Sequence, residues 1–256
     1  MAKKETIGRT FAVIGGLCLV CSIVVSVAAV GLKPIQQRNQ VLDVQTNIVD
    51  VAGLGRANVA ENYARYIEAR LVDLDTGEFS DLPAEGYNQR NATKDTSASI
   101  ALSGGEDPAG IRRRANLAPV YLAKDENGEL DSIILPVHGQ GLWSTMYAFV
   151  AVAPDGNTIK GITYYEQGET PGLGGEIENP NWRAQFVGKQ LFDEQGQPAL
   201  RVVKGGAPEG SEHGVDGLSG ATLTSNGVQY TFEFWMGPKG FGPFLAKIRE
   251  GELNNG

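Results

Sequence analysis

Residues 216–226, DGLSGATLTSN, bring several hydroxyl side chains to the expected start of a helix. Ser219 and Gly220 are typical of a turn, and Thr222 falls in or next to the first helical turn. That end of a helix presents unpaired backbone N–H groups and a partial positive charge, so it can hold a phosphate without a basic side chain. A hydroxyl there would be a nucleophile beside a phosphate. Taken alone, however, Ser and Thr at a helix start are most often plain caps.

Two glycine-rich segments each follow an expected strand. They are residues 138–143, HGQGLW, and residues 169–175, ETPGLGG. Glycine is the default turn residue, so either segment by itself is more often a turn than a site.

The first stretch resembles the flavinylation sequence Asp-x-x-Ser/Thr-Gly-Ala-Thr of the FMN-binding domain family. In that family a flavin transferase joins FMN to the last threonine through a phosphoester bond. The resemblance implies that Thr222 carries the flavin, although spacing alone leaves Thr224 and Ser225 as competitors. It also implies a cofactor-binding role for the neighbouring Asp216, Leu218, Ser219, Gly220, Ala221 and Thr224.

The glycine-rich segments resemble the Gly-Leu-Trp and Glu-Thr-Pro-Gly-Leu-Gly stretches that border the isoalloxazine ring in the same family. Glycine would let backbone N–H groups approach the ring, and leucine or tryptophan could cover its faces. Glu169 either faces the flavin or hydrogen-bonds the loop, and both alternatives stay open. The residues implied are Gly141, Leu142, Trp143, Glu169, Thr170, Gly172, Leu173 and Gly174.

Residues 11–32 contain no charged side chain, which is enough for a helix to cross a bilayer. Lys3, Lys4 and Arg9 precede this span, so residues 1–10 are expected in the cytoplasm and the bulk of the chain outside it. A cleavable signal peptide is less favoured, because its apolar core normally runs only ~7–15 residues. The two cysteines, Cys18 and Cys21, lie inside the span and are expected only to pack.

Residues 33–116 are expected to form a juxtamembrane helical and loop region. Gly53 and Gly55 break a first helix, and residues 57–74 show apolar side chains at helical spacing. Residues 86–116 are rich in Ser, Gly, Asn and charge, which favours a loop. The three arginines at 112–114 are expected in a solvated turn.

Residues 117–256 are expected to form an FMN-binding domain of α+β class, with antiparallel strands and flanking helices. Turns at 127–128 and 155–156 predict two hairpins. A helix is expected from Asn179 through Leu191, a short strand at 200–203, and closing helices near 222–236 and 243–250.

Composition excludes some functions. The net charge is −8, and the first 38 residues hold five Lys or Arg against one Glu, so the rest carries −12. A domain that acidic is a poor nucleic-acid binder. We see no metal cluster or general base, and His138 and His213 are expected to be structural. With no dinucleotide fingerprint, the chain alone is not expected to oxidise NADH.

The whole chain resembles the family of C subunits of the sodium-translocating NADH:quinone oxidoreductases. This resemblance implies an electron relay in the bacterial inner membrane: a single-pass protein with a cytoplasmic N-terminus and a periplasmic flavin domain. Its partners would be the other membrane, flavin and iron–sulfur subunits, with the flavin transferase acting during maturation. The homologous G subunit of the ferredoxin:NAD-type complex is the alternative, but it is usually shorter than this chain. A flavin-free, membrane-anchored binding module is the competing class, and a soluble flavoenzyme would need a pocket base that we do not find.

Overall fold

The computed structural model describes residues 7–252, and the chain divides into two units, Met1–Val44 and Gln45–Gly256. Helix α1 (Ile7–Val51) contains the uncharged span, and within residues 7–252 it is the one helix long and apolar enough to cross a membrane. It ends just before Gly53 and Gly55, whose φ angles of 79° and 73° explain the break. The expected cytoplasmic segment 1–10 lies in part, at residues 1–6, outside the described residues.

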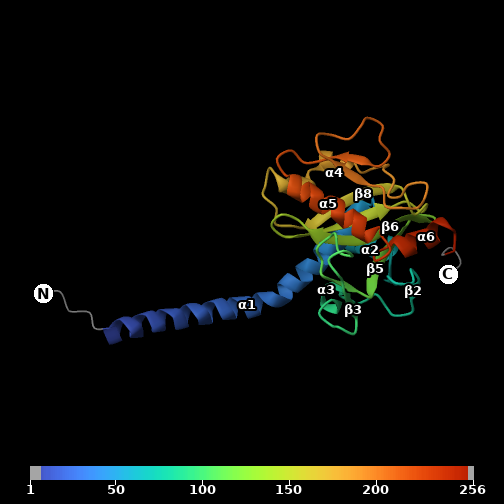
Figure 1. Ribbon diagram of the computed structural model, residues 1–256. Helices are drawn as coiled ribbons and strands as arrows, with labels where there is room; N and C mark the ends of the chain where they lie inside the picture. Colours follow the sequence, from blue (N-terminus) through green and yellow to red (C-terminus); the bar gives the residue numbers. More distant parts are fainter. Residues whose placement is uncertain (1–6, 253–256) are drawn as a thin grey trace. The chain divides into compact units, whose positions relative to one another are not determined.

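The second unit is built on a six-stranded antiparallel sheet in the order β2-β1-β5-β6-β7-β8 (Figure 1). Both expected hairpins are confirmed, because β5 pairs with β6 and β7 pairs with β8. The strands are β1 (Ile67–Asp73), β2 (Phe79–Ser80), β5 (Leu117–Lys124), β6 (Leu130–Gln140), β7 (Thr145–Val152) and β8 (Ile159–Glu166).

Smaller elements surround this sheet. Two further pairs of strands form, β3 with β4 and, in parallel, β9 with β10. The expected α+β class, with one long apolar N-terminal helix, is confirmed. These elements are α2 (Val59–Tyr66), α3 (Gln89–Ala92), β3 (Ser99–Ala101), β4 (Arg113–Ala115), the 3-10 helix η1 (Gly174–Glu178), α4 (Pro180–Ala184), β9 (Arg201–Val203), β10 (Gly214–Asp216), α5 (Thr222–Trp235) and α6 (Gly242–Arg249).

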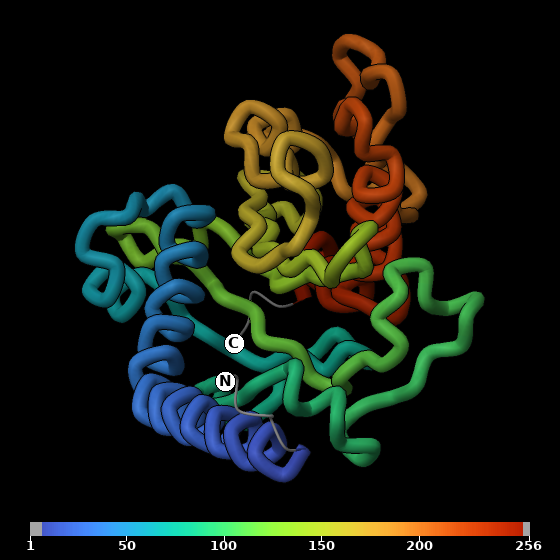
Figure 2. The backbone as a smooth tube through the Cα atoms, turned by 90° about the vertical axis from the view of Figure 1, so that its left-hand side faces the viewer, coloured from blue at the N-terminus to red at the C-terminus, as the bar shows by residue number. Residues whose placement is uncertain are grey.

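Helix α5 packs against the sheet and forms the centre of the core. Its side chains Val228, Phe232 and Trp235 are buried, each contributing about 1.5–3 kcal/mol. Trp235 also donates its indole N–H to the carbonyl oxygen of His138 on β6, at 2.7 Å. Figure 2 shows α5 beside the segment that connects β8 to it (yellow to orange). The core therefore fixes the C-terminal end of α5 beside β6.

The helix expected at residues 57–74 is wrong beyond Tyr66. Residues Ile67–Asp73 form strand β1, which pairs with β5 along its whole length. Apolar spacing in this short segment fitted a helix, but the backbone partners that β5 offers decide for a strand. The boundary expected at residue 117 therefore falls inside the second unit. The helix from Asn179 begins as expected, with Pro180 in its first turn, but it ends at Ala184.

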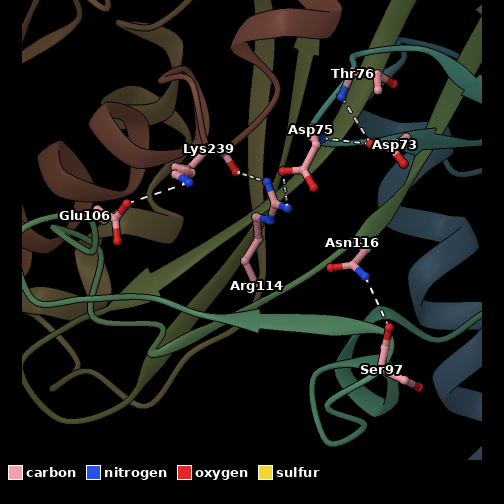
Figure 3. Close-up of polar contacts among 8 residues, drawn as sticks. All are labelled: Asp73, Asp75, Thr76, Ser97, Glu106, Arg114, Asn116 and Lys239. Atoms are coloured by element: carbon pink, nitrogen blue, oxygen red, sulfur yellow. Dashed lines mark hydrogen bonds and ion pairs between the residues drawn. The ribbon is translucent and has the colours of Figure 1, made fainter.

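Arg114 is fully buried, so the solvated turn expected for it is wrong. Its Nη2 pairs with Asp75 Oδ1 at 2.7 Å, and its Nη1 donates to the carbonyl oxygen of Lys239 at 3.0 Å (Figure 3). Arg114 lies on β4, where the loop expected at 86–116 contains short strands and a helical turn. The guanidinium thus joins three segments that are far apart in the sequence.

Candidate functional site

The first candidate segment is a turn that leads from strand β10 into helix α5. β10 ends at Asp216, and Gly217 donates its N–H to the carbonyl oxygen of Val203 on β9 at 2.8 Å. Gly220 has a φ of 74°, a value that favours glycine. The helix then begins at Thr222. The helix start expected near residue 222 is confirmed.

The three hydroxyls of this segment have different surroundings. Thr224 is buried and donates to Glu169 Oε2 at 2.5 Å. Ser225 is also buried, and its Oγ accepts the N–H of Leu218 at 2.9 Å. Thr222 is exposed, and no hydrogen bond of its side chain is found within residues 7–252. Of the three, Thr222 alone presents an unengaged hydroxyl to solvent.

Thr222 also lines a pocket of about 450 Å³. One wall is the turn that precedes α5, and another is the loop that follows β9. Sequence reasoning missed the second wall, although a lysine and two glycines directly after a strand were a usable signal. The lining residues are Val202, Lys204, Gly205, Gly206, Asp216, Gly217, Leu218, Ser219, Gly220, Thr222, Ser225 and Asn226.

Glu169 connects the two glycine-rich segments to α5. It is 4% exposed, and its carboxylate accepts the backbone N–H groups of Leu142 (3.2 Å), Trp143 (2.9 Å) and Ser144 (3.3 Å). The bond from Thr224 completes the set. Of the two alternatives for Glu169, the structure therefore favours the one in which it hydrogen-bonds the loop.

These bonds also set the charge of Glu169. Burial raises the pKa of a carboxyl, but the hydrogen bonds from Thr224 and from the N–H groups of Trp143, Ser144 and Leu142 outweigh it. The pKa of Glu169 therefore lies below its ordinary value, and the side chain is a carboxylate at neutral pH.

Two of the glycines expected to bind the cofactor, Gly141 and Gly174, pack closely against Glu169 and Thr224. A Cβ on Gly141 would lie 2.5 Å from Glu169 Oε1, and one on Gly174 would lie 2.5 Å from Thr224 Oγ1. Both glycines make room for the Glu169 junction, by which we mean the Glu169 carboxylate with its hydrogen-bond donors, the backbone of residues 142–144 and the hydroxyl of Thr224. The N–H groups that follow Gly141 point at this carboxylate and are not free to approach a ring.

Apolar side chains are exposed around the junction. Leu142, Trp143 and Leu173 are 46%, 69% and 45% exposed, and Leu223, which sequence reasoning missed, is 59% exposed. Leu173 reaches the turn before α5, since a Cβ on Gly220 would lie 3.2 Å from its Cδ2. Of the other residues expected here, Thr170 is exposed and Gly172 has a φ of 75°. The fold thus brings all three sequence segments together.

An antiparallel α+β domain with this turn, junction and apolar surface defines a protein of the FMN-binding domain class, and residues 141–237 match the FMN-binding domain family. Over 99% of both chains it is 64% identical to the C subunit of the Na(+)-translocating NADH-quinone reductase of Vibrio alginolyticus. The corresponding protein of Yersinia pestis is 56% identical over 99% of this chain and 97% of its own. The chain belongs to the family of C subunits of the Na(+)-translocating NADH-quinone reductases.

Solved structures agree with this assignment. The crystal structure of Shewanella oneidensis NqrC superposes with a TM-score of 0.76 at 42% identity, covering 81% of this chain and 96% of that one. The C subunit of the Parabacteroides distasonis Na(+)-translocating NADH-quinone reductase gives a TM-score of 0.66 at 30% identity, covering 84% and 96%. The family match favours the C subunit over the G subunit of the ferredoxin:NAD-type complex.

Proposed function

We propose that this chain is the electron-relay C subunit of a membrane-bound Na(+)-translocating NADH-quinone reductase, and that its FMN is joined to Thr222 by a phosphoester. The exposure of the Thr222 hydroxyl carries this proposal. Its rivals Thr224 and Ser225 are buried, with 1% and 6% of their surface exposed, and both hydroxyl oxygens are engaged in hydrogen bonds within the protein. Thr222 is therefore the most accessible of the three to a transferase.

The surroundings of Thr222 suit FMN. As the first residue of α5, a helix of 14 residues, it lies among unpaired backbone N–H groups that favour a phosphate. Leu142, Trp143 and Leu173 offer exposed apolar surface to an aromatic ring, and their loops are held by Glu169. When bound, FMN supplies electron transfer, and the chain's own residues supply position and electrostatics.

The remaining expectations complete the proposal. Residues 11–32 span the bacterial inner membrane once, with residues 1–10 in the cytoplasm and the flavin-carrying domain, from residue 45 on, in the periplasm. The partners are the other membrane, flavin and iron–sulfur subunits of the complex, and a flavin transferase acts during maturation. Sodium transport belongs to that complex. A covalent bond keeps the flavin on a site that is open to solvent and distant from cytoplasmic FMN.

The test is denaturing gel electrophoresis under ultraviolet light, with the intact mass measured in parallel. The full chain is expressed with the flavin transferase as wild type, Thr222→Ala and Thr224→Ser, the last as a matched control that keeps the bond to Glu169. We expect a fluorescent band, and a mass gain of one FMN less one water, in the wild type and Thr224→Ser but not in Thr222→Ala.

The competing class, a flavin-free anchored binding module, predicts a dark band in all three proteins. A dark, unmodified wild type in cells that flavinylate another substrate would refute the proposed function. If Thr222→Ala stays fluorescent, a fourth protein, Thr224→Ala, is made. Loss of fluorescence in Thr224→Ala would then leave the function standing and move the attachment to Thr224.

A further inference from the structure

The loop after β9 forms a wall of the pocket that holds Thr222. Lys204, Gly205 and Gly206 all line this pocket. The loop turns back on itself, since Gly206 donates its N–H to the carbonyl oxygen of Val203 at 3.2 Å. The φ angles of 86° at Gly205 and 107° at Gly206 favour glycine at both positions. The loop is therefore a defined turn with Lys204 at its start.

Asp216 holds this turn. Its Oδ1 accepts the N–H of Ala207 at 2.7 Å, across nine residues of sequence. Its own backbone is fixed on the other side, because its N–H donates to Gln185 Oε1 at 2.9 Å and its carbonyl oxygen accepts the indole N–H of Trp182 at 2.7 Å. Asp216 thus ties the lysine loop to the strand that leads into α5. This gives the first residue of the flavinylation sequence a structural task of its own.

Lys204 is the single Lys or Arg among the pocket residues. It is exposed, and its ammonium group makes no ion pair or hydrogen bond within the part of the chain that the structure describes. The one carboxylate of the pocket, Asp216, already accepts the Ala207 N–H. In a chain of net charge −8, a cation without an internal partner beside the helix start is free to serve a bound anion.

We infer that Lys204 is the counter-ion of the flavin phosphate and that Asp216 is the positioning residue that holds its loop against the pocket. This inference rests on the proposed function, since it takes the anion to be the phosphate group attached at Thr222. The start of α5 then provides backbone N–H groups to the phosphate, and Lys204 provides a positive charge from another wall of the same pocket. The apolar loops around Glu169 contact the isoalloxazine ring and do not contribute to binding the phosphate.

The experiment separates the phosphate from the ring by comparing free FMN with riboflavin, which lacks the phosphate. Both are titrated by fluorescence into the full-length Thr222→Ala chain, purified without transferase, which cannot form the covalent bond. We expect FMN to bind more tightly than riboflavin. Adding Lys204→Gln should reduce that preference about fivefold, the upper range for one exposed ion pair, and leave riboflavin affinity unchanged. Lys204→Arg should retain the preference, and Lys124→Gln, a lysine paired with Glu68 on the sheet, is the matched control.

Substitutions of Asp216 provide a second test in the same titration. Asp216→Asn keeps an oxygen that can accept the Ala207 N–H, whereas Asp216→Ala does not. We expect Asp216→Ala to lose the FMN preference as Lys204→Gln does, and Asp216→Asn to keep most of it. Thermal melts of each variant show that it is folded. Adding Lys204→Gln to Asp216→Ala should then change little, because both act on one group.

An FMN preference that is absent in Thr222→Ala, or that survives Lys204→Gln unchanged, would overturn the inference. So would a loss of riboflavin affinity equal to that of FMN, which would indicate a general structural effect. The proposed function is tested separately by the intact mass of the transferase-treated wild type. If the wild type is flavinylated but Lys204→Gln leaves the preference for FMN over riboflavin unchanged, only the counter-ion role of Lys204 is refuted. If the wild type is not modified, the attachment at Thr222 is refuted.

Discussion

Replacing Glu169 with glutamine should destabilise the flavin-carrying unit by about 2–3 kcal/mol. The carboxylate accepts four hydrogen bonds, three from the backbone of residues 142–144 and one from Thr224. A glutamine oxygen can keep the Trp143 and Ser144 N–H groups, which both approach Oε1. Its NH₂ group then faces the Leu142 N–H, a contact of two donors, and the remaining bonds lose their charge assistance. One charge-assisted bond is worth about 1.5–3 kcal/mol.

The pH dependence has a definite sign. The pKa of Glu169 is lower in the folded chain than its ordinary value of 4.5. The carboxylate therefore stabilises the fold fully at pH above 4.5, and that stabilisation is lost as pH falls through the folded pKa. Since glutamine does not titrate, the gap in stability between wild type and Glu169→Gln should be largest at neutral pH and should shrink below pH 4.5.

The assay is thermal unfolding of the flavin-free full chain in detergent, followed by near-ultraviolet circular dichroism. For a unit of this size, ~2–3 kcal/mol corresponds to a Tm decrease of about 4–12 °C. Glu178→Gln is the matched control, because Glu178 is exposed and accepts one bond from Gln167. A Tm of Glu169→Gln within a degree of wild type, or a gap that persists undiminished at low pH, would refute the assigned junction.

Two further predictions concern two other side chains, the buried, charged Arg114 and the neutral His138. Asp75→Ala leaves the guanidinium of Arg114 buried with one partner (Figure 3), so we expect a loss of about 3 kcal/mol by urea titration, and Asp75→Asn, which keeps an acceptor, should lose clearly less. An equal loss in both variants would contradict this role of Asp75. Burial, assisted by the positive charge of Arg90, lowers the pKa of His138 to about 4. The NMR signals of the His138 ring should therefore stay constant from about pH 8 to 5.5. The free energy of unfolding should fall as pH drops below about 6.5, because His138 gains a proton in the unfolded chain but not in the folded one. A titration midpoint near 6.5 in the folded chain would argue against the burial of His138.

Local signals predicted much of the fold correctly. The hairpins at 127–128 and 155–156, the proline start at Asn179 and the helix that begins at Thr222 all depend on residues within one turn of the feature. The uncharged span of α1 is likewise visible as a continuous run of residues in the sequence. Such features are specified by backbone preferences and hydrophobic spacing over a few residues, which the sequence displays directly.

Non-local pairing accounts for the failures. Ile67–Asp73 has apolar residues that fit either the helical or the strand period. Pairing with β5, about fifty residues later, extends along the whole segment and makes it a strand. Arg114 looks solvated among its charged neighbours, yet Asp75 and the Lys239 carbonyl allow it to be buried. A partner distant in sequence can outweigh local preference by several kcal/mol, and a linear pattern does not show that partner.

The candidate site shows the same division between features that the local sequence predicts and features that depend on distant residues. The sequence by itself determined the family, the segment in which we propose the flavin attachment and the need for a turn at Gly220, because these rest on residue identity and short spacing. Only the tertiary structure decided that Thr224 and Ser225 are engaged while Thr222 is exposed, that Glu169 serves the loop, and that Lys204 shares the pocket. Exposure and hydrogen bonding are properties of neighbours that folding supplies, and 55 residues separate Glu169 from Thr224.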